Sequence, residues 1–113
     1  MASVSIEFSG WTLGGAAGTA IVSRCVRQED VTITSGATTN MAGAAISDEE
    51  AAKGVNICRL ATGDTGCYFA VGSTPDPSSG AESSGSGARR WLPAGSSIEV
   101  PIHKAQKVAI RGA

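Results

Sequence analysis

The stretch Val55–Gly72 constrains the fold of this chain more than any other. Two β-prone runs flank a short segment rich in Gly, Thr and Asp, which is the composition typical of a chain reversal. We expect a central hairpin with Gly63 and Asp64 at its tip. Directly opposed residues then share one side of the sheet. The predicted opposed pairs are Leu60 with Cys67, Cys58 with Phe69, and Arg59 with Tyr68.

Strict alternation divides this predicted hairpin into two faces. The inner face is apolar throughout, whereas the outward face is only weakly polar. A weakly polar outward face indicates that a second surface covers it. The predicted inner residues are Cys58, Leu60, Cys67, Phe69 and Val71, and the outward residues are Ile57, Arg59, Tyr68 and Ala70.

Short alternating runs separated by turn residues recur along the rest of the chain, which favours strands over helices. We predict one all-β domain over residues 1–113, a small β-sandwich or jelly-roll-like barrel of about seven or eight strands. Pro101 cannot donate a ladder hydrogen bond, so its strand should lie at an edge or carry a bulge. Besides the two strands of the hairpin, the predicted strands are Val4–Phe8, Thr19–Arg27, Val31–Thr34, Ser97–His103 and Lys107–Arg111.

Several connections follow from local composition. Ser9–Gly10 should end the first strand, residues 11–18 should form a loop, and Gln28–Asp30 should turn between the second and third strands. Ser47 with Glu three residues later and a closing Gly54 predicts one short helical turn.

The segment 73–88 is the main anomaly of the sequence. It is rich in Ser and Gly, and we expect a flexible loop that is functional or mobile. After it, Trp91 and Leu92 are expected to return to the core. Arg89 and Arg90 beside that Trp could instead hold a phosphate or a glycan, although arginines lying along a buried Trp are the simpler interpretation.

The charge of the chain excludes one class of partner. The formal net charge is −1, whereas nucleic-acid binding needs a basic stripe. Through Gly80 there are eight acidic and four basic residues, and after it two acidic and five basic. The two halves either interleave into a mixed surface or form complementary patches that meet between subunits.

No catalytic residue, metal ligand or cofactor site is predicted. His103 is the single histidine, and the three cysteines show no Cys-x-x-Cys spacing. We expect free and mostly buried thiols, with Cys58 and Cys67 as diagonal neighbours, and synthesis in a reducing compartment. The glycine-rich residues 11–18 lack the pattern of a phosphate loop. No membrane contact is expected, because no apolar run approaches a membrane span and the N-terminus lacks a signal pattern.

A set of C-terminal motifs resembles small β-structured accessory virion proteins of tailed bacteriophages. The matching parts are Val55–Leu60, a Gly turn, Tyr68–Gly72, a variable loop, Trp91–Ser96, Ile98–Ile102 and Lys107–Ile110. This resemblance implies an accessory structural role, most often capsid decoration or cementing, and brings no catalytic residues with it.

The expected function is therefore that of a non-enzymatic capsid decoration (cement) protein. It would be synthesised in the host cytoplasm and bind the outer head surface of the virion as an oligomer, with a trimer as the expected form. Its expected partners are the major capsid protein and further copies of itself. A head–tail junction or spike component, or a carbohydrate-binding adhesin-like module, is the alternative. The predicted interface residues are Ile57, Arg59, Tyr68, Arg89, Arg90 and Trp91.

Overall fold

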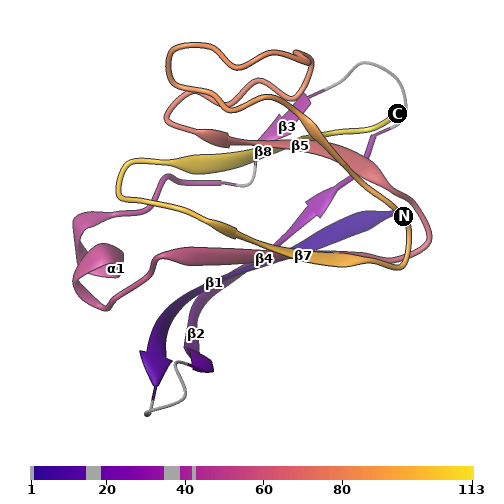
Figure 1. Ribbon diagram of the computed structural model, residues 1–113. Helices are drawn as coiled ribbons and strands as arrows, with labels where there is room; N and C mark the ends of the chain where they lie inside the picture. Colours follow the sequence, from indigo (N-terminus) through magenta and orange to yellow (C-terminus); the bar gives the residue numbers. More distant parts are fainter. Residues whose placement is uncertain (1, 15–18, 35–38, 42) are drawn as a thin grey trace.

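The regular secondary structure of the protein is almost entirely antiparallel strand, as a computed structural model shows for residues 2–14, 19–34, 39–41 and 43–113. The strands are β1 (Ser3–Gly14), β2 (Thr19–Thr32), β3 (Thr39–Met41), β4 (Ile57–Thr62), β5 (Cys67–Gly72), β6 (Arg90–Leu92), β7 (Ser97–Pro101) and β8 (Lys107–Arg111), and the helix is α1 (Asp48–Ala52). They form two sheets, ordered β2-β1-β4-β7 and β3-β8-β5-β6 (Figure 1). The all-β prediction is confirmed.

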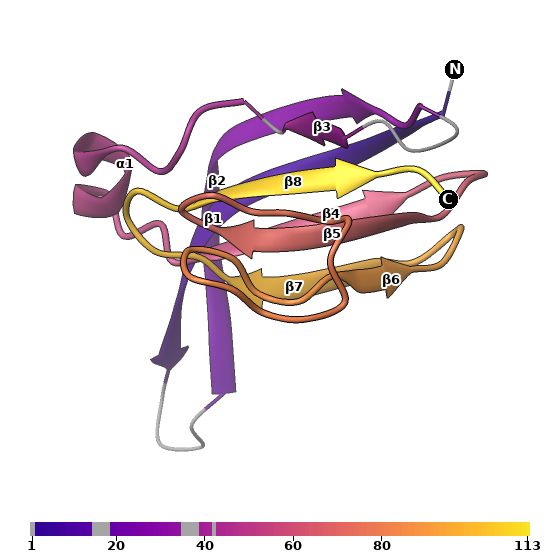
Figure 2. The same ribbon diagram turned by 90° about the horizontal axis from the view of Figure 1, so that it is seen from above.

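The two sheets lie as two layers with one apolar core between them (Figures 1 and 2). In β1 every second residue faces this core, so Val4, Ile6 and Phe8 are buried. In β8 Val108 and Ile110 do the same from the other layer. The choice between a β-sandwich and a jelly-roll-like barrel stays a prediction.

The predicted central hairpin is wrong in its pairing. β4 pairs with β1 and β7, whereas β5 pairs with β6 and β8 in the other sheet. Residues 63–66 therefore carry the chain from one layer to the other, and Cys58 and Cys67 are not neighbours within one sheet. The predicted inner face nevertheless holds, because the same alternate residues face the core from opposite layers. Cys58, Leu60, Cys67 and Phe69 are buried, and Val71 is partly buried.

A second crossing segment holds this connection in place. The chain between β6 and β7 also passes from one sheet to the other, and it lies against the end of β4. The Thr62 hydroxyl donates to the Pro93 carbonyl at 2.6 Å, and the Gly95 amide donates to the Gly63 carbonyl at 2.7 Å. These hydrogen bonds satisfy backbone and hydroxyl groups that a hairpin turn would have paired within one sheet.

The first two strands are longer than predicted. β1 continues past Ser9–Gly10 to Gly14, and β2 runs unbroken through Gln28–Asp30. Of the polar residues predicted to form a turn, Gln28 and Asp30 lie on the outer side of the sheet, where Gln28 pairs with Glu7. Glu29 lies between them on the core-facing side, opposite Ile6. Because β4 pairs with β1 only from Val4 to Ser9, the remainder of β1 and β2 forms a two-stranded ribbon that extends beyond the sheets (Figure 1). Of the predicted loop 11–18, residues 15–18 lie outside the described part.

The predicted helical turn is confirmed, because α1 covers Asp48–Ala52. The Ser47 hydroxyl accepts a hydrogen bond from the Glu50 amide, and the Glu50 carboxylate accepts one from the Ser47 amide, both at 3.1 Å. This reciprocal pair satisfies two backbone donors that a helix start leaves unpaired. Lys104 adds an ion pair with Asp48 at 3.1 Å, which ties the helix to the turn before β8.

The loop 73–88 folds back over the outer side of β5 and β8 (Figures 1 and 2). The Thr74 amide donates to the Gly85 carbonyl at 2.9 Å, the Gly87 amide donates to the Val71 carbonyl at 3.0 Å, and Pro77 is fully buried. Alternation puts Ala70 and its partner Ala109 on this outer side, yet both are buried. The surface that covers Ala70 on the outward face of β5 is thus the chain's own loop.

Replacing Gly72 with Ala should destabilise the fold through this loop. A Cβ at that position would lie 2.8 Å from the Gly85 carbonyl carbon and 2.9 Å from the Ser86 Cα, so the loop backbone must shift. We expect a loss of about 1–3 kcal/mol in the free energy of unfolding, measured by urea denaturation. Gly80→Ala is the matched control, since its Cβ would meet nothing within 4 Å. Equal stability of the two variants would contradict the described packing.

Candidate functional site

An aromatic and cationic surface stands out on the outer side of the second sheet. Tyr68 and Trp91 oppose each other on β5 and β6, with ring centroids 4.9 Å apart and an interplanar angle of 64°. The Arg89 guanidinium carbon lies 4.2 Å from the centroid of the Tyr68 ring. Arg111 pairs with Tyr68 from the opposite side, on β8. We call Tyr68, Arg89, Trp91 and Arg111 the aromatic patch.

Trp91 is 46% exposed, so the prediction that it is buried is wrong. It lies on β6, a three-residue strand at the edge of its sheet, where alternation sends Leu92 inward and its neighbour outward. Leu92 is buried as predicted. The Trp91 ring passes over Gly66, where a Cβ would meet ring carbon Cζ2 at 2.7 Å. The Trp91 ring can therefore pack against the sheet because Gly66 has no side chain.

The structure brings together three of the six predicted interface residues, namely Tyr68, Arg89 and Trp91. Arg90 lies at the sheet edge with its guanidinium carbon 5.7 Å from the centroid of the Phe69 ring. Ile57 and Arg59 are on β4, in the other sheet. Sequence reasoning missed Arg111, because only the pairing of β5 with β8 puts it beside Tyr68.

Charged side chains also lie on the core-facing side of β2. Arg27 covers the Phe8 ring at 4.2 Å, and its Nε lies 3.2 Å from Oε2 of Glu50. Its guanidinium also donates to the Ala44 carbonyl at 2.9 Å. These contacts tie residues 44–50 to β2 and serve the fold. Glu29, two residues along β2, has an Oε2 atom that is buried without a hydrogen-bond partner.

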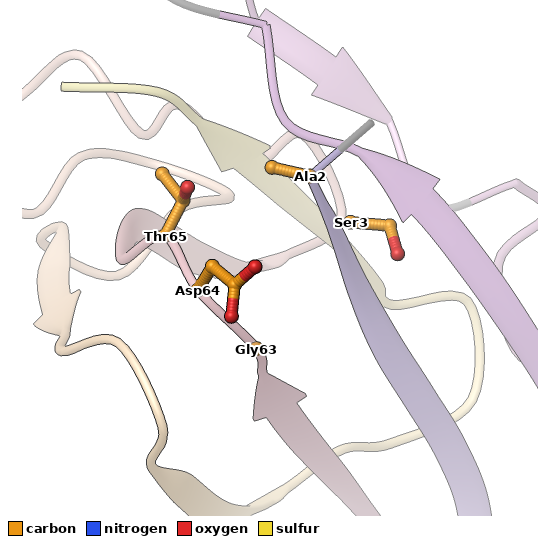
Figure 3. Close-up of a pocket in the computed structure, with 5 residues that line it drawn as sticks. All are labelled: Ala2, Ser3, Gly63, Asp64 and Thr65. Atoms are coloured by element: carbon orange, nitrogen blue, oxygen red, sulfur yellow. The ribbon is translucent and has the colours of Figure 1, made fainter.

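Cavities offer little chemistry in the described part of the chain. A cavity of about 370 Å³ lies between the start of β1 and residues 63–65 (Figure 3). Asp64 and Thr65 are its polar side chains at that end, opposite Ala2 and Ser3. A smaller cavity of about 130 Å³ lies beside Phe69 and Val100, with Arg90 at its margin. Among the described residues no group of three metal-ligating side chains is found, and no helix is long and apolar enough to cross a membrane.

Burial explains why two of the three thiols are poor nucleophiles. It raises the pKa of Cys58 to about 12 and that of Cys67 to about 11. Both side chains lie in the core, as expected for mostly buried thiols. Cys25 is exposed, and its Sγ donates to the Arg27 carbonyl at 3.1 Å.

Glu29→Gln should change how stability depends on pH. Burial raises the pKa of Glu29 above its ordinary value of 4.5, with Arg27 lowering it and Glu50 raising it to smaller extents. A raised pKa in the folded state favours the protonated acid, so this contribution is present at pH below 4.5 and is lost as pH rises through the folded pKa. We expect the Gln variant to be more stable than the parent at neutral pH, and the difference to shrink on acidification. Urea unfolding across a pH series measures this, and a less stable variant at neutral pH would contradict it.

Thiol labelling should separate the three cysteines. In the folded protein we expect iodoacetamide to modify Cys25 quickly and to leave Cys58 and Cys67 unmodified, because the two buried groups are both shielded and protonated. Peptide mass spectrometry after timed labelling gives the rates. Labelling in denaturant is the control, in which all three should react. Fast labelling of Cys58 in the native protein would contradict the described core.

Comparison with known proteins adds no relative. No protein-family model, curated protein or solved structure matches this chain. A function for this chain must therefore be inferred from the described residues and from the sequence resemblance.

Proposed function

We propose that this protein is a non-enzymatic virion structural protein of a tailed bacteriophage. Its role is capsid decoration (cement), in which an oligomer, with a trimer as the expected form, binds and stabilises the outer head surface. The observation that carries a binding role is the aromatic patch. The sequence resemblance over residues 55–110 supports two further parts of the proposal, namely a location on the virion and the major capsid protein as a partner.

The composition of the patch favours protein contact. Trp, Tyr and Arg are the residue types that most often dominate interface energetics. Here the Trp91 ring is held against Gly66 and the Tyr68 ring before any partner arrives. Side chains that are already ordered lose less conformational entropy on binding, so more of the contact energy is left for affinity.

A decoration role also suits the modest size of this surface. Many copies bind one lattice, so weak contacts act in parallel and no single deep site is required. The strands at the edges of the two sheets are β2, β7, β3 and β6. The outer side of the first sheet, and the part of the second sheet that loop 73–88 leaves uncovered, are available for lattice and subunit contacts.

Two alternatives use the same surface. An exposed Trp with neighbouring guanidinium groups can stack on and hydrogen-bond a sugar, so a carbohydrate-binding adhesin-like module is the second candidate. A glycan array with hits that depend on Trp91 would favour it. The other is a different virion location, at the head–tail junction or in a spike.

A reconstruction of virions that carry the protein tests the location. Density that fits this fold at the local symmetry axes of the capsid would support decoration. Density found at the tail or portal alone would sink decoration and leave a virion role standing.

Trp91→Ala tests the role of the patch in head binding. Because Trp91 is largely outside the core, we expect near-parental stability but at least about a tenfold weaker binding, equivalent to about 1.4 kcal/mol. The measurement is co-sedimentation with purified heads that lack the protein. Glu49→Ala is the matched control, since Glu49 is exposed on α1. Unchanged binding by the Trp91 variant would remove the patch from the proposal.

A further inference from the structure

The outer side of the first sheet carries a row of charges across three strands. Glu7 on β1 pairs with Arg59 on β4, and Arg59 pairs with Glu99 on β7. Asp30 on β2 lies on the same side, since it alternates with buried Val31. We call Glu7, Asp30, Arg59 and Glu99 the acidic face. It carries three carboxylates and one guanidinium.

Short side chains lie between the acids of the acidic face. The residues between them in β1, β4 and β7 are short, as at Ser5, Ala61 and Ser97. The ion pairs found within the described ranges involve Arg27, Lys53 and Lys104, none of which belongs to this face. Asp30 accepts a hydrogen bond from the Gln28 side-chain amide at 2.9 Å, and Glu7 and Glu99 belong to none of these ion pairs. A surface that combines short side chains with such carboxylates can accept a protruding aromatic ring and a guanidinium.

The aromatic patch has the opposite character and points the opposite way. It lies on the outer side of the second sheet and carries Arg89 and Arg111, with Asp76 close enough to offset part of the Arg111 charge. Because the two sheets lie one above the other with the core between them, the two surfaces of one molecule face away from each other (Figure 1). The two surfaces of one copy therefore cannot contact each other, but each can contact the complementary surface of another copy.

We infer that the protein self-associates head to tail, with the aromatic patch of one copy against the acidic face of the next. This inference rests on the oligomer in the proposed function and names its interface, so the aromatic patch acts in head binding by holding together the oligomer whose copies bind in parallel. Two acidic faces would repel each other, so the contact joins two different surfaces and is heterologous. A heterologous contact builds a ring when the rotation between successive copies closes on itself. Every copy supplies one surface of each kind, so the partner is always present at a matching concentration.

Three variants test the pairing of these surfaces. Arg89→Glu reverses the charge above Tyr68. The triple variant Glu7→Lys, Arg59→Glu, Glu99→Lys reverses the row while keeping opposite charges across the strands, which protects the fold. The third variant combines all four changes. Sedimentation velocity and light scattering give the mass, and circular dichroism and thermal unfolding check that each variant folds.

We expect the parent to form oligomers that weaken with salt, and each single-surface variant to dissociate at least about tenfold more readily. The combined variant should regain assembly, because both surfaces are reversed. A monomeric parent, unchanged assembly of both single-surface variants, or failure of the folded combined variant to assemble would each overturn the inference. If a charge reversal prevents folding, Arg89→Ala with Trp91→Ala replaces it, and full assembly of that variant would likewise overturn the inference.

Co-sedimentation with heads separates this inference from the proposed function. A monomeric parent that still binds heads overturns self-association and leaves decoration standing. A parent that assembles as described but fails to bind any head supports the interface and counts against decoration.

Discussion

The core of this molecule is shared by two sheets, and each sheet contributes one of the chain's two Phe residues. Phe8 faces the core from β1 and Phe69 faces it from β5, and both are almost fully buried. Most other core side chains are Val, Ile, Leu and Cys. Removing either ring would be expected to cost about 3–5 kcal/mol, a large part of the stability of a domain of this size. Neither sheet could keep its apolar face out of water without the other.

Arginine side chains that lie over aromatic rings connect further parts of the chain to the two sheets. Arg27 covers Phe8 and also joins Glu50, so the helix and the segment before it are fixed against β2. On the outer side Arg89 covers Tyr68, which shapes the aromatic patch. A guanidinium over a ring combines apolar contact with charge, and so suits positions between core and solvent.

Local patterns in the sequence predicted which strand residues face the core and where the helix begins, but not which strands pair with each other. Alternation placed Leu60 and Phe69 correctly on the core side, and the capping residues placed α1 correctly. The pairing of β4 failed because a hairpin and a crossing between layers bury the same alternate residues, so alternation cannot separate them. The exposure of Trp91 and the position of Arg111 beside Tyr68 depend on which strands are edges and neighbours. Those are non-local choices that no short motif carries, and for that reason only half of the predicted interface residues came together.

The crossing of the chain between layers has a consequence for how the protein folds. β1 pairs with β4 some fifty residues later, and β3 pairs with β8 about seventy residues later, whereas the successive strands β4 and β5 lie in different sheets. β1 can pair early with β2, but β4 needs β7, and both β3 and β5 need β8, so neither sheet is complete until nearly the whole chain has been synthesised. Loop closure over such separations makes folding slow relative to helical domains of the same length. During that interval the unpaired edges of the early strands stay open to other chains, so synthesis is the stage at which this protein is most exposed to aggregation.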